Sequence, residues 1–166
     1  MNKKWVLSHR FIDFDIARAK ERHTIVHRFN ERLQAGIEYN PGADEIGFIG
    51  NFMLAQETEK APMVNLGTSS DRIGTPEGPK SYYVTFAKGF PKHKLGPYVT
   101  INYSEHDRGF NFPFGCSYTF QPGISAMFMN DGRKSHLLAT YSKESWSVSL
   151  MWVWFKHPGI SLSWGF

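Results

Sequence analysis

Apolar and polar residues alternate along most of this chain with a period of two. In residues 110–120 every even position is apolar or aromatic, and every odd position is small or polar. The same alternation recurs in residues 32–39, 97–104 and 146–154. Successive side chains of a β-strand point to opposite faces, so the pattern predicts strands with one apolar and one polar face.

Gly, Pro, Asn and Asp residues divide the alternating pattern into about twelve strands of about 8–12 residues, and no stretch keeps a helical period. An even number of strands returns both termini to the same end of a barrel. We expect a single domain, residues 1–166. The predicted strands are residues 4–16, 22–29, 32–40, 45–57, 61–72, 80–89, 96–105, 109–120, 123–130, 134–142, 145–156 and 159–166.

The chemistry of the two faces predicts that this sheet closes in a membrane. In the C-terminal half the polar face carries Ser, Thr, Asn and Gly, while charge gathers in connections such as residues 105–108 and 131–134. A soluble barrel would carry charge on its water-exposed face, and rows of Phe and Trp would overfill a small interior. We therefore predict an all-β fold, a closed antiparallel up-and-down transmembrane β-barrel.

The alternation assigns side chains to the two faces of the wall. The residues expected to face lipid are Phe110, Phe112, Phe114, Tyr118, Phe120, Trp146, Val148, Leu150, Trp152 and Trp154. The residues expected to face the lumen are Asp13, Asp15, Arg28, Arg32, Gln34, Glu38, Tyr83, Tyr98, Thr100, Asn102, Asn111 and Ser117.

Composition narrows the functional classes. The formal net charge is +4, but the 19 basic residues are scattered, so we do not expect a nucleic-acid partner. Cys116 is the single cysteine and excludes a disulfide within the chain. The basic opening at residues 1–4 resembles a signal peptide, but residues 8–10 interrupt the apolar segment that should follow. We expect a mature or recombinant form of an exported chain.

The sequence offers only weak evidence for catalytic or metal-binding pairs of residues. Ser8–His9 and Ser135–His136 are sequence neighbours, which a strand directs to opposite faces, although a dyad across strands stays open. His23 and His27 share a face but lie about 13 Å apart on a strand. We therefore predict no metal, no cofactor and no catalytic residue. The longest loop, residues 71–79, is the candidate contact for a partner or a lipid headgroup.

The end of the chain resembles the closing strand of bacterial outer-membrane proteins, in which alternating hydrophobic residues end in an aromatic one. Residues 159–166 carry this pattern, and residues 27–39 are similar to a common hairpin of such barrels. The resemblance implies recognition by the barrel assembly machinery and a location in the bacterial outer membrane. A weaker resemblance is to YjbH-type barrels linked to exopolysaccharide export. The matching positions of the closing strand are Ile160, Leu162, Trp164 and Phe166.

These observations favour an outer-membrane barrel, in contact with outer-membrane lipid, that acts as a narrow passive pore or a structural component. A barrel of about twelve strands lies between small barrels filled by side chains and open porins. Two alternatives stay open. One is an outer-membrane lipid or peptide hydrolase, and the other is a soluble lipocalin-like binding barrel.

Overall fold

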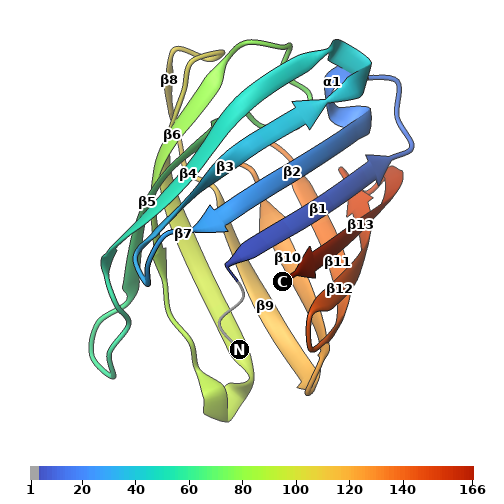
Figure 1. The fold of residues 1–166 in the computed structure, drawn as a ribbon. Helices are drawn as coiled ribbons and strands as arrows, with labels where there is room; N and C mark the ends of the chain where they lie inside the picture. The colour runs from blue at the N-terminus through green and yellow to red at the C-terminus, as the bar shows by residue number, and fades with distance from the viewer. Residues whose placement is uncertain (1–3) are drawn as a thin grey trace.

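The computed structural model describes residues 4–166, and strands form nearly all of its regular secondary structure (Figure 1). Residues 1–3 of the basic opening at residues 1–4 lie outside the described residues. The strands are β1 (Trp5–Ile12), β2 (Glu21–Arg28), β3 (Leu33–Asn40), β4 (Glu45–Ala55), β5 (Met63–Ser70), β6 (Lys80–Ala87), β7 (Leu95–Ser104), β8 (Gly109–Asn111), β9 (Phe114–Gln121), β10 (Ile124–Asn130), β11 (Ser135–Lys143), β12 (Trp146–Val153) and β13 (His157–Gly165).

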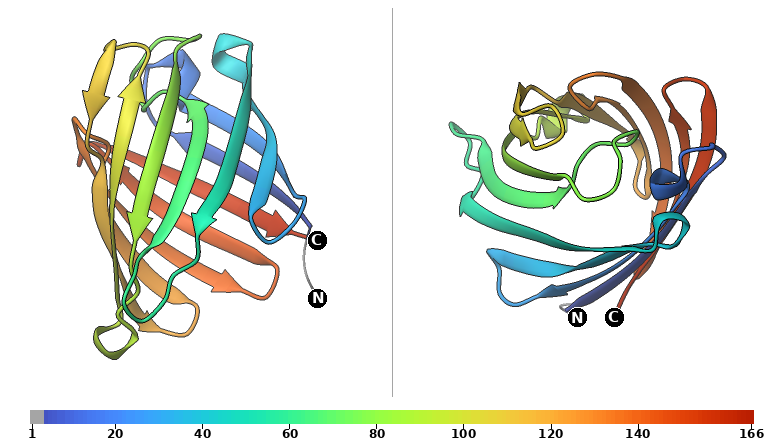
Figure 2. Two further views of the ribbon diagram at one scale, coloured as in Figure 1. Left: turned by 90° about the vertical axis from the view of Figure 1, so that its left-hand side faces the viewer. Right: turned by 90° about the horizontal axis from the view of Figure 1, so that it is seen from above.

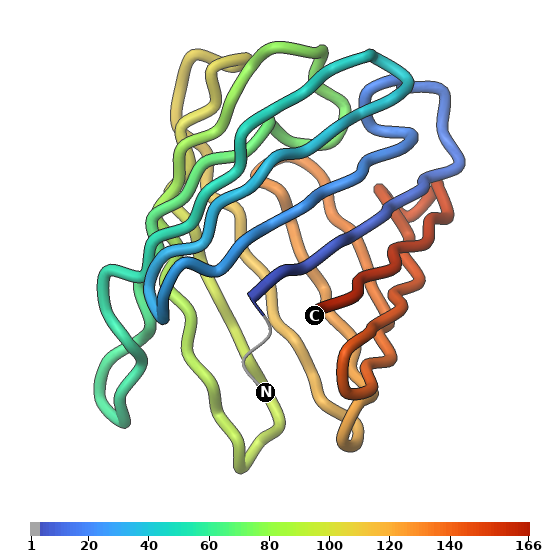
Figure 3. Tube along the Cα trace, in the orientation of Figure 1, coloured from blue at the N-terminus to red at the C-terminus, as the bar shows by residue number. Residues whose placement is uncertain are grey.

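The sheet closes on itself because its first and last strands pair. Consecutive strands pair antiparallel, except that β8 and β9 both pair with β7, and β1 also pairs antiparallel with β13, from Val6 opposite Gly165 to Ile12 opposite Gly159. Seen from above, the strands surround a central space (Figure 2), and the tube trace follows the same ring (Figure 3). Closure pairs the two end strands of the chain with each other, as a membrane requires, and among residues 4–166 only the short β8 pairs with a single neighbour, β7.

The β8 and β9 segments are two halves of one barrel strand. Both pair with β7, and only Phe112 and Pro113 separate them. Pro113 has no backbone N–H to donate, but its carbonyl still accepts a 2.7 Å hydrogen bond from Thr100 N. The thirteen segments of the ring therefore make twelve barrel strands, as the sequence predicts.

The two ends of the barrel differ. The start of β1 and the end of β13 lie at one end, which we call the turn end; the opposite end, the loop end, holds α1 (Ala17–Lys20) (Figure 1). Two short 3-10 helices, Pro41–Ala43 and Pro91–His93, complete the helical content of residues 4–166. No helix in these residues has the length and apolar character to cross a membrane. The loop-end connections are residues 13–20, 41–44, 71–79, 105–108, 131–134 and 154–156.

Several predicted strands are shorter than expected, and two of them have a clear structural reason. The first ends at Ile12 instead of residue 16, because the chain then turns into α1. The strand predicted over 145–156 ends at Val153, because Trp154 and Phe155 have positive φ angles of 56° and 54°. A positive φ cannot continue a strand.

The apolar face of the wall points outward. Side chains such as Phe110, Leu150 and Ile46 are exposed, whereas the buried apolar residues are few and gather mainly at the loop end. A water-soluble barrel buries its large apolar side chains and exposes its polar ones. This arrangement is the reverse, and it argues against the lipocalin-like alternative.

Candidate pore interior

Hydroxyl groups line one side of the interior, along β1 and β11 to β13. Ser8 Oγ and Ser163 Oγ lie 2.8 Å apart across the β1–β13 seam. Thr140 Oγ1 and Ser149 Oγ, on β11 and β12, are also 2.8 Å apart. A hydroxyl donates one hydrogen bond and can accept others, so these groups make the wall polar without adding charge.

Tyrosine rings lie flat against glycines of the inner wall. A Cβ atom added at Gly67 would stand 2.4 Å from the ring of Tyr83. The ring of Tyr98 packs in the same way on Gly115, where an added Cβ would stand 2.6 Å from it. Tyr83 Oη donates a 3.0 Å hydrogen bond to Asn51 Oδ1. The two glycines therefore keep room inside the barrel for large aromatic side chains.

Charged side chains gather on the part of the interior wall that adjoins these hydroxyl groups, from β1 to β3. The side chain of Glu38 is fully buried and forms an ion pair with Arg22, whose Nε donates a 2.6 Å hydrogen bond to Glu38 Oε2. Ser70 N donates to Glu38 Oε1 at 2.9 Å. Arg10 lies opposite Arg22 in the β1–β2 register, and its Nε is buried without a hydrogen-bond partner among residues 4–166. This side therefore holds more positive than negative charge.

The loop of residues 71–79 is anchored to the loop end by Arg18 of α1. Arg18 Nε donates to the carbonyl of Thr75 at 3.0 Å. Arg18 Nη2 donates to Asp71 O at 3.0 Å, to Arg72 O at 2.7 Å and to Thr75 Oγ1 at 2.7 Å. Burial lowers the pKa of Arg18 from its ordinary value, but the guanidinium stays charged at neutral pH. One buried cation therefore satisfies three backbone carbonyls of the loop.

The carboxylate of Asp71 holds the other side of this loop against the wall. It accepts hydrogen bonds from Ser81 Oγ at 3.1 Å and from Ser104 Oγ.

A small apolar cluster packs beside α1 at the same end of the barrel. Its buried members are Ile12, Phe14, Ala19 and Val153. Polar and apolar contacts together narrow the loop end.

Two aspartates form ion pairs around a hollow of about 360 Å³ at the loop-end rim. Asp107 accepts hydrogen bonds from Arg72 at 2.6 Å and from Arg133 at 3.3 Å, and the bond from Arg72 holds its pKa below 3.8. Burial opposes ionisation of Asp131, but hydrogen bonds from His136 and from backbone N–H groups still lower its pKa. Both carboxylates are therefore charged at neutral pH and fix the loops around the rim.

Two hollows lie at the turn end. One hollow of about 490 Å³ is lined by residues including Lys4, Arg28, Arg32 and Met53. A second, also about 490 Å³, is lined by Tyr98 and Met127 among others. We call these two hollows the turn-end mouth.

The structure corrects three of the predicted lumen positions. Asp13 and Asp15 are exposed in the connection after β1, because the strand stops at Ile12 and the buried neighbour is Phe14. Arg32 is exposed in the β2–β3 turn, and with Arg28 it borders the turn-end mouth. The remaining predicted positions lie on the inward side of their strands: Gln34, Glu38, Tyr83, Tyr98, Thr100, Asn102, Asn111 and Ser117.

Of the predicted lipid-facing residues, Trp154 also needs correction. It lies in the turn after β12 and packs edge-on against Phe14, with ring centroids 5.0 Å apart, instead of pointing outward from a strand. Val148 is half-buried among its outward neighbours. The other eight are exposed: Phe110, Phe112, Phe114, Tyr118, Phe120, Trp146, Leu150 and Trp152. The residues of the closing pattern are exposed as well: Ile160, Leu162, Trp164 and Phe166.

The adjacent serine and histidine pairs do not form dyads. Ser8 points inward to Ser163 while His9 points outward. His136 bonds to Asp131 at 2.9 Å, and Ser135 bonds to Asn130. Among residues 4–166 no serine hydroxyl is hydrogen-bonded to a histidine ring.

Sequence reasoning missed the three arginines that dominate the charged side and the loop end, Arg10, Arg18 and Arg22. Alternation is weak around them, since every residue of β2 from Glu21 to His27 is half-buried. Ser8 and Thr24 lie opposite each other in the β1–β2 register and face inward. Arg10 and Arg22 lie two residues from them, and this spacing is the signal that could have placed both arginines inside.

Comparison with known proteins supports the architecture. No protein-family model and no curated protein sequence matches the chain. Among solved structures, a KdgM porin superposes with a TM-score of 0.62 and 11% sequence identity, over 98% of this chain and 99% of that chain. At this identity the likeness concerns the fold. The protein is a closed, twelve-stranded antiparallel β-barrel with the fold of this porin.

Proposed function

We propose that this barrel is a narrow passive pore of a bacterial outer membrane. The observation that carries the proposal is the inside-out distribution of polarity: hydroxyl and charged groups line a closed wall whose outside is apolar. Backbone groups in lipid must be paired within the protein, and a closed barrel does this. The exposed apolar side chains fit contact with hydrocarbon, with outer-membrane lipid as the surrounding partner.

The fold of the KdgM porin supports the same function. We further propose that the barrel assembly machinery reads the closing strand through Ile160, Leu162, Trp164 and Phe166. The YjbH-type resemblance assigns no residue and stays a prediction. A purely structural barrel is the second candidate, because the loop of residues 71–79 and Arg18 narrow one end.

Recording current across planar bilayers after refolding the full chain tests the proposal. We expect discrete, ohmic current steps. A membrane that stays sealed after verified insertion would refute the pore and favour the structural barrel.

A matched pair of cysteines checks that current runs through the interior. In a Cys116→Ser background, Ser8→Cys places a thiol inside the wall and Leu7→Cys places one outside. A bulky, water-soluble thiol reagent should reduce the current of Ser8→Cys and leave that of Leu7→Cys unchanged. Equal effects at both positions would contradict conduction through the barrel.

A further inference from the structure

Three polar side chains interrupt the apolar outer wall near the loop end. His9 on β1 and His23 on β2 are direct register partners, and Glu21 precedes His23 by two residues on the same face. The outward neighbours of His9 are Leu7 and Phe11 along β1, and Leu162 across the seam. This cluster faces away from the interior, so the proposed pore makes no use of it.

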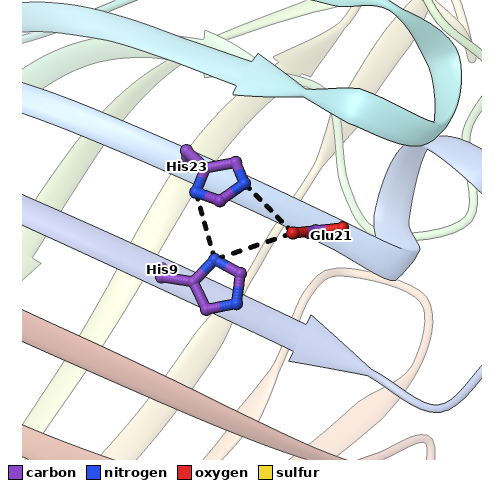
Figure 4. A group of neighbouring side chains, drawn as sticks. All are labelled: His9, Glu21 and His23. Carbon is purple, nitrogen blue, oxygen red and sulfur yellow. Dashed lines mark hydrogen bonds and ion pairs between the residues drawn. The ribbon is translucent and has the colours of Figure 1, made fainter.

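Figure 4 shows the three groups converging. The Nδ1 atoms of His9 and His23 are 3.1 Å apart, and His23 Nε2 lies 3.1 Å from Glu21 Oε1. His9 Nδ1 lies 4.0 Å from the same Glu21 oxygen. One ligand atom from each residue can be chosen so that all three lie within 4.8 Å of one another.

We propose that His9, Glu21 and His23 bind a divalent first-row transition-metal ion, with Zn²⁺ as the reference ion. Zn–N and Zn–O bonds of about 2.1 Å in a tetrahedron place neighbouring ligand atoms about 3.4 Å apart. The distances of 3.1 Å and 4.0 Å from His9 Nδ1 bracket this value. Small side-chain rotations therefore suffice to bind the ion, and water can fill the fourth position.

The polar atoms of the cluster also favour a cation. Only one hydrogen can lie between the two facing Nδ1 atoms, and the carboxylate group of Glu21 lies beside both rings. A bound cation would take a lone pair from each imidazole and neutralise the carboxylate. Two imidazoles with one carboxylate suit Zn²⁺, Ni²⁺ or Cu²⁺, whereas Mg²⁺ and Ca²⁺ prefer oxygen ligands throughout.

The surrounding structure holds the ligands in place. Both histidines stand on paired strands of the closed wall, which fixes their backbone separation. The ring of Tyr39 stacks on His23 with centroids 6.4 Å apart, and Tyr39 Oη donates to Asp44 at 3.3 Å. Groups that orient ligands in this way raise metal affinity. A bound ion would link β1 to β2, one strand from the seam that closes the barrel.

Metal titration of the refolded full chain tests this site. The protein, folded in detergent micelles and stripped with a chelator, is titrated with Zn²⁺ in a calorimeter. We expect one ion per chain, and a tetrahedral visible spectrum when Co²⁺ replaces Zn²⁺. His9→Gln and Glu21→Gln should each weaken binding by about 10- to 100-fold or more. His27→Gln, on the same strand and face, is the matched control and should leave affinity unchanged.

Circular dichroism verifies that each variant keeps its strand content. If His9→Gln does not refold, the nearly isosteric Glu21→Gln decides. No measurable Zn²⁺ binding by the parent protein would overturn the proposal, as would affinity unaffected by Glu21→Gln. Equal weakening in His27→Gln would do the same, because it would mean that scattered histidines bind the ion. This test does not measure bilayer current, so it can refute the metal site without refuting the pore, and the bilayer experiment can refute the pore without refuting the metal site.

Discussion

Replacing Arg18 by alanine should release the loop of residues 71–79 from the loop end. The guanidinium is buried and donates all four hydrogen bonds that α1 makes to this loop. Alanine would leave three carbonyls and one hydroxyl without their donor. The strands themselves lose no contact in the wall, so we expect the barrel to stay folded while the loop opens.

The size of the effect follows from these four bonds. A hydrogen bond to a charged group contributes about 1.5–3 kcal/mol net. The four acceptors share only two nitrogen atoms, so their contributions overlap, and we expect a total of about 3–5 kcal/mol. Since 1.4 kcal/mol is a factor of ten, the open population of the loop should rise at least about a hundredfold.

Trypsin digestion in micelles measures this change, because Arg72 is the only trypsin site within the loop of residues 71–79. Cleavage after Arg72 should become much faster in Arg18→Ala. Cleavage after Arg133, in a different loop, serves as the internal control and should keep its rate. The cleavage rate of Arg18→Lys at Arg72 should lie between those of the parent protein and Arg18→Ala, because an ammonium group cannot reproduce the planar fork of a guanidinium. An unchanged cleavage rate at Arg72 in Arg18→Ala would refute the anchoring role.

Three further predictions test the interior, the rim and the packing of the wall. Glu38→Gln leaves Arg22 without its ion pair, so the reversal potential in a KCl gradient should shift towards the chloride equilibrium potential. Glu57→Gln removes a charge from an exposed ion pair and should shift the reversal potential less. Asp107 has a lowered pKa when folded, so its stabilisation is complete above the unfolded pKa of about 4 and disappears as pH falls through the folded value; thermal unfolding of the parent should therefore lose more stability on acidification than that of Asp107→Asn. Gly67→Ala places a methyl group 2.4 Å from Tyr83 and should destabilise the barrel by about 1–3 kcal/mol in denaturant unfolding, whereas Gly109→Ala, whose nearest atom is 3.8 Å away, should change little.

The number of strands and the direction of their faces could be predicted from sequence, because the period of two records them directly. Residues 110–120 show this well: Phe110 and Phe114 are exposed outside, and Asn111 is buried inside. The breaks at Ile12 and Val153 could not be predicted, since the alternation continues into Phe14 and Trp154. There the loop end packs apolar side chains of its own, and local pattern does not distinguish them from strand residues.

Features that depend on long-range register were also beyond the sequence pattern. The spacing of His23 and His27 relates two residues of one strand, but the partner of His23 is His9, fourteen residues away on the neighbouring strand. Arg18 reaches a loop more than fifty residues further along the chain. Such pairs become visible only when the β1–β2 register and the path of the loop are known.

The seam between β1 and β13 also sets the order of events in folding. Leu7 pairs with Trp164, so the contact that completes the ring joins residues 157 positions apart. Contacts of such long range form slowly, because the entropy of closing the whole chain is lost before they contribute. Until they form, two strand edges expose unpaired backbone groups that lipid cannot satisfy. Ring closure and entry into hydrocarbon should therefore be a single concerted event, and a chain that has lost its final strand should aggregate instead of inserting.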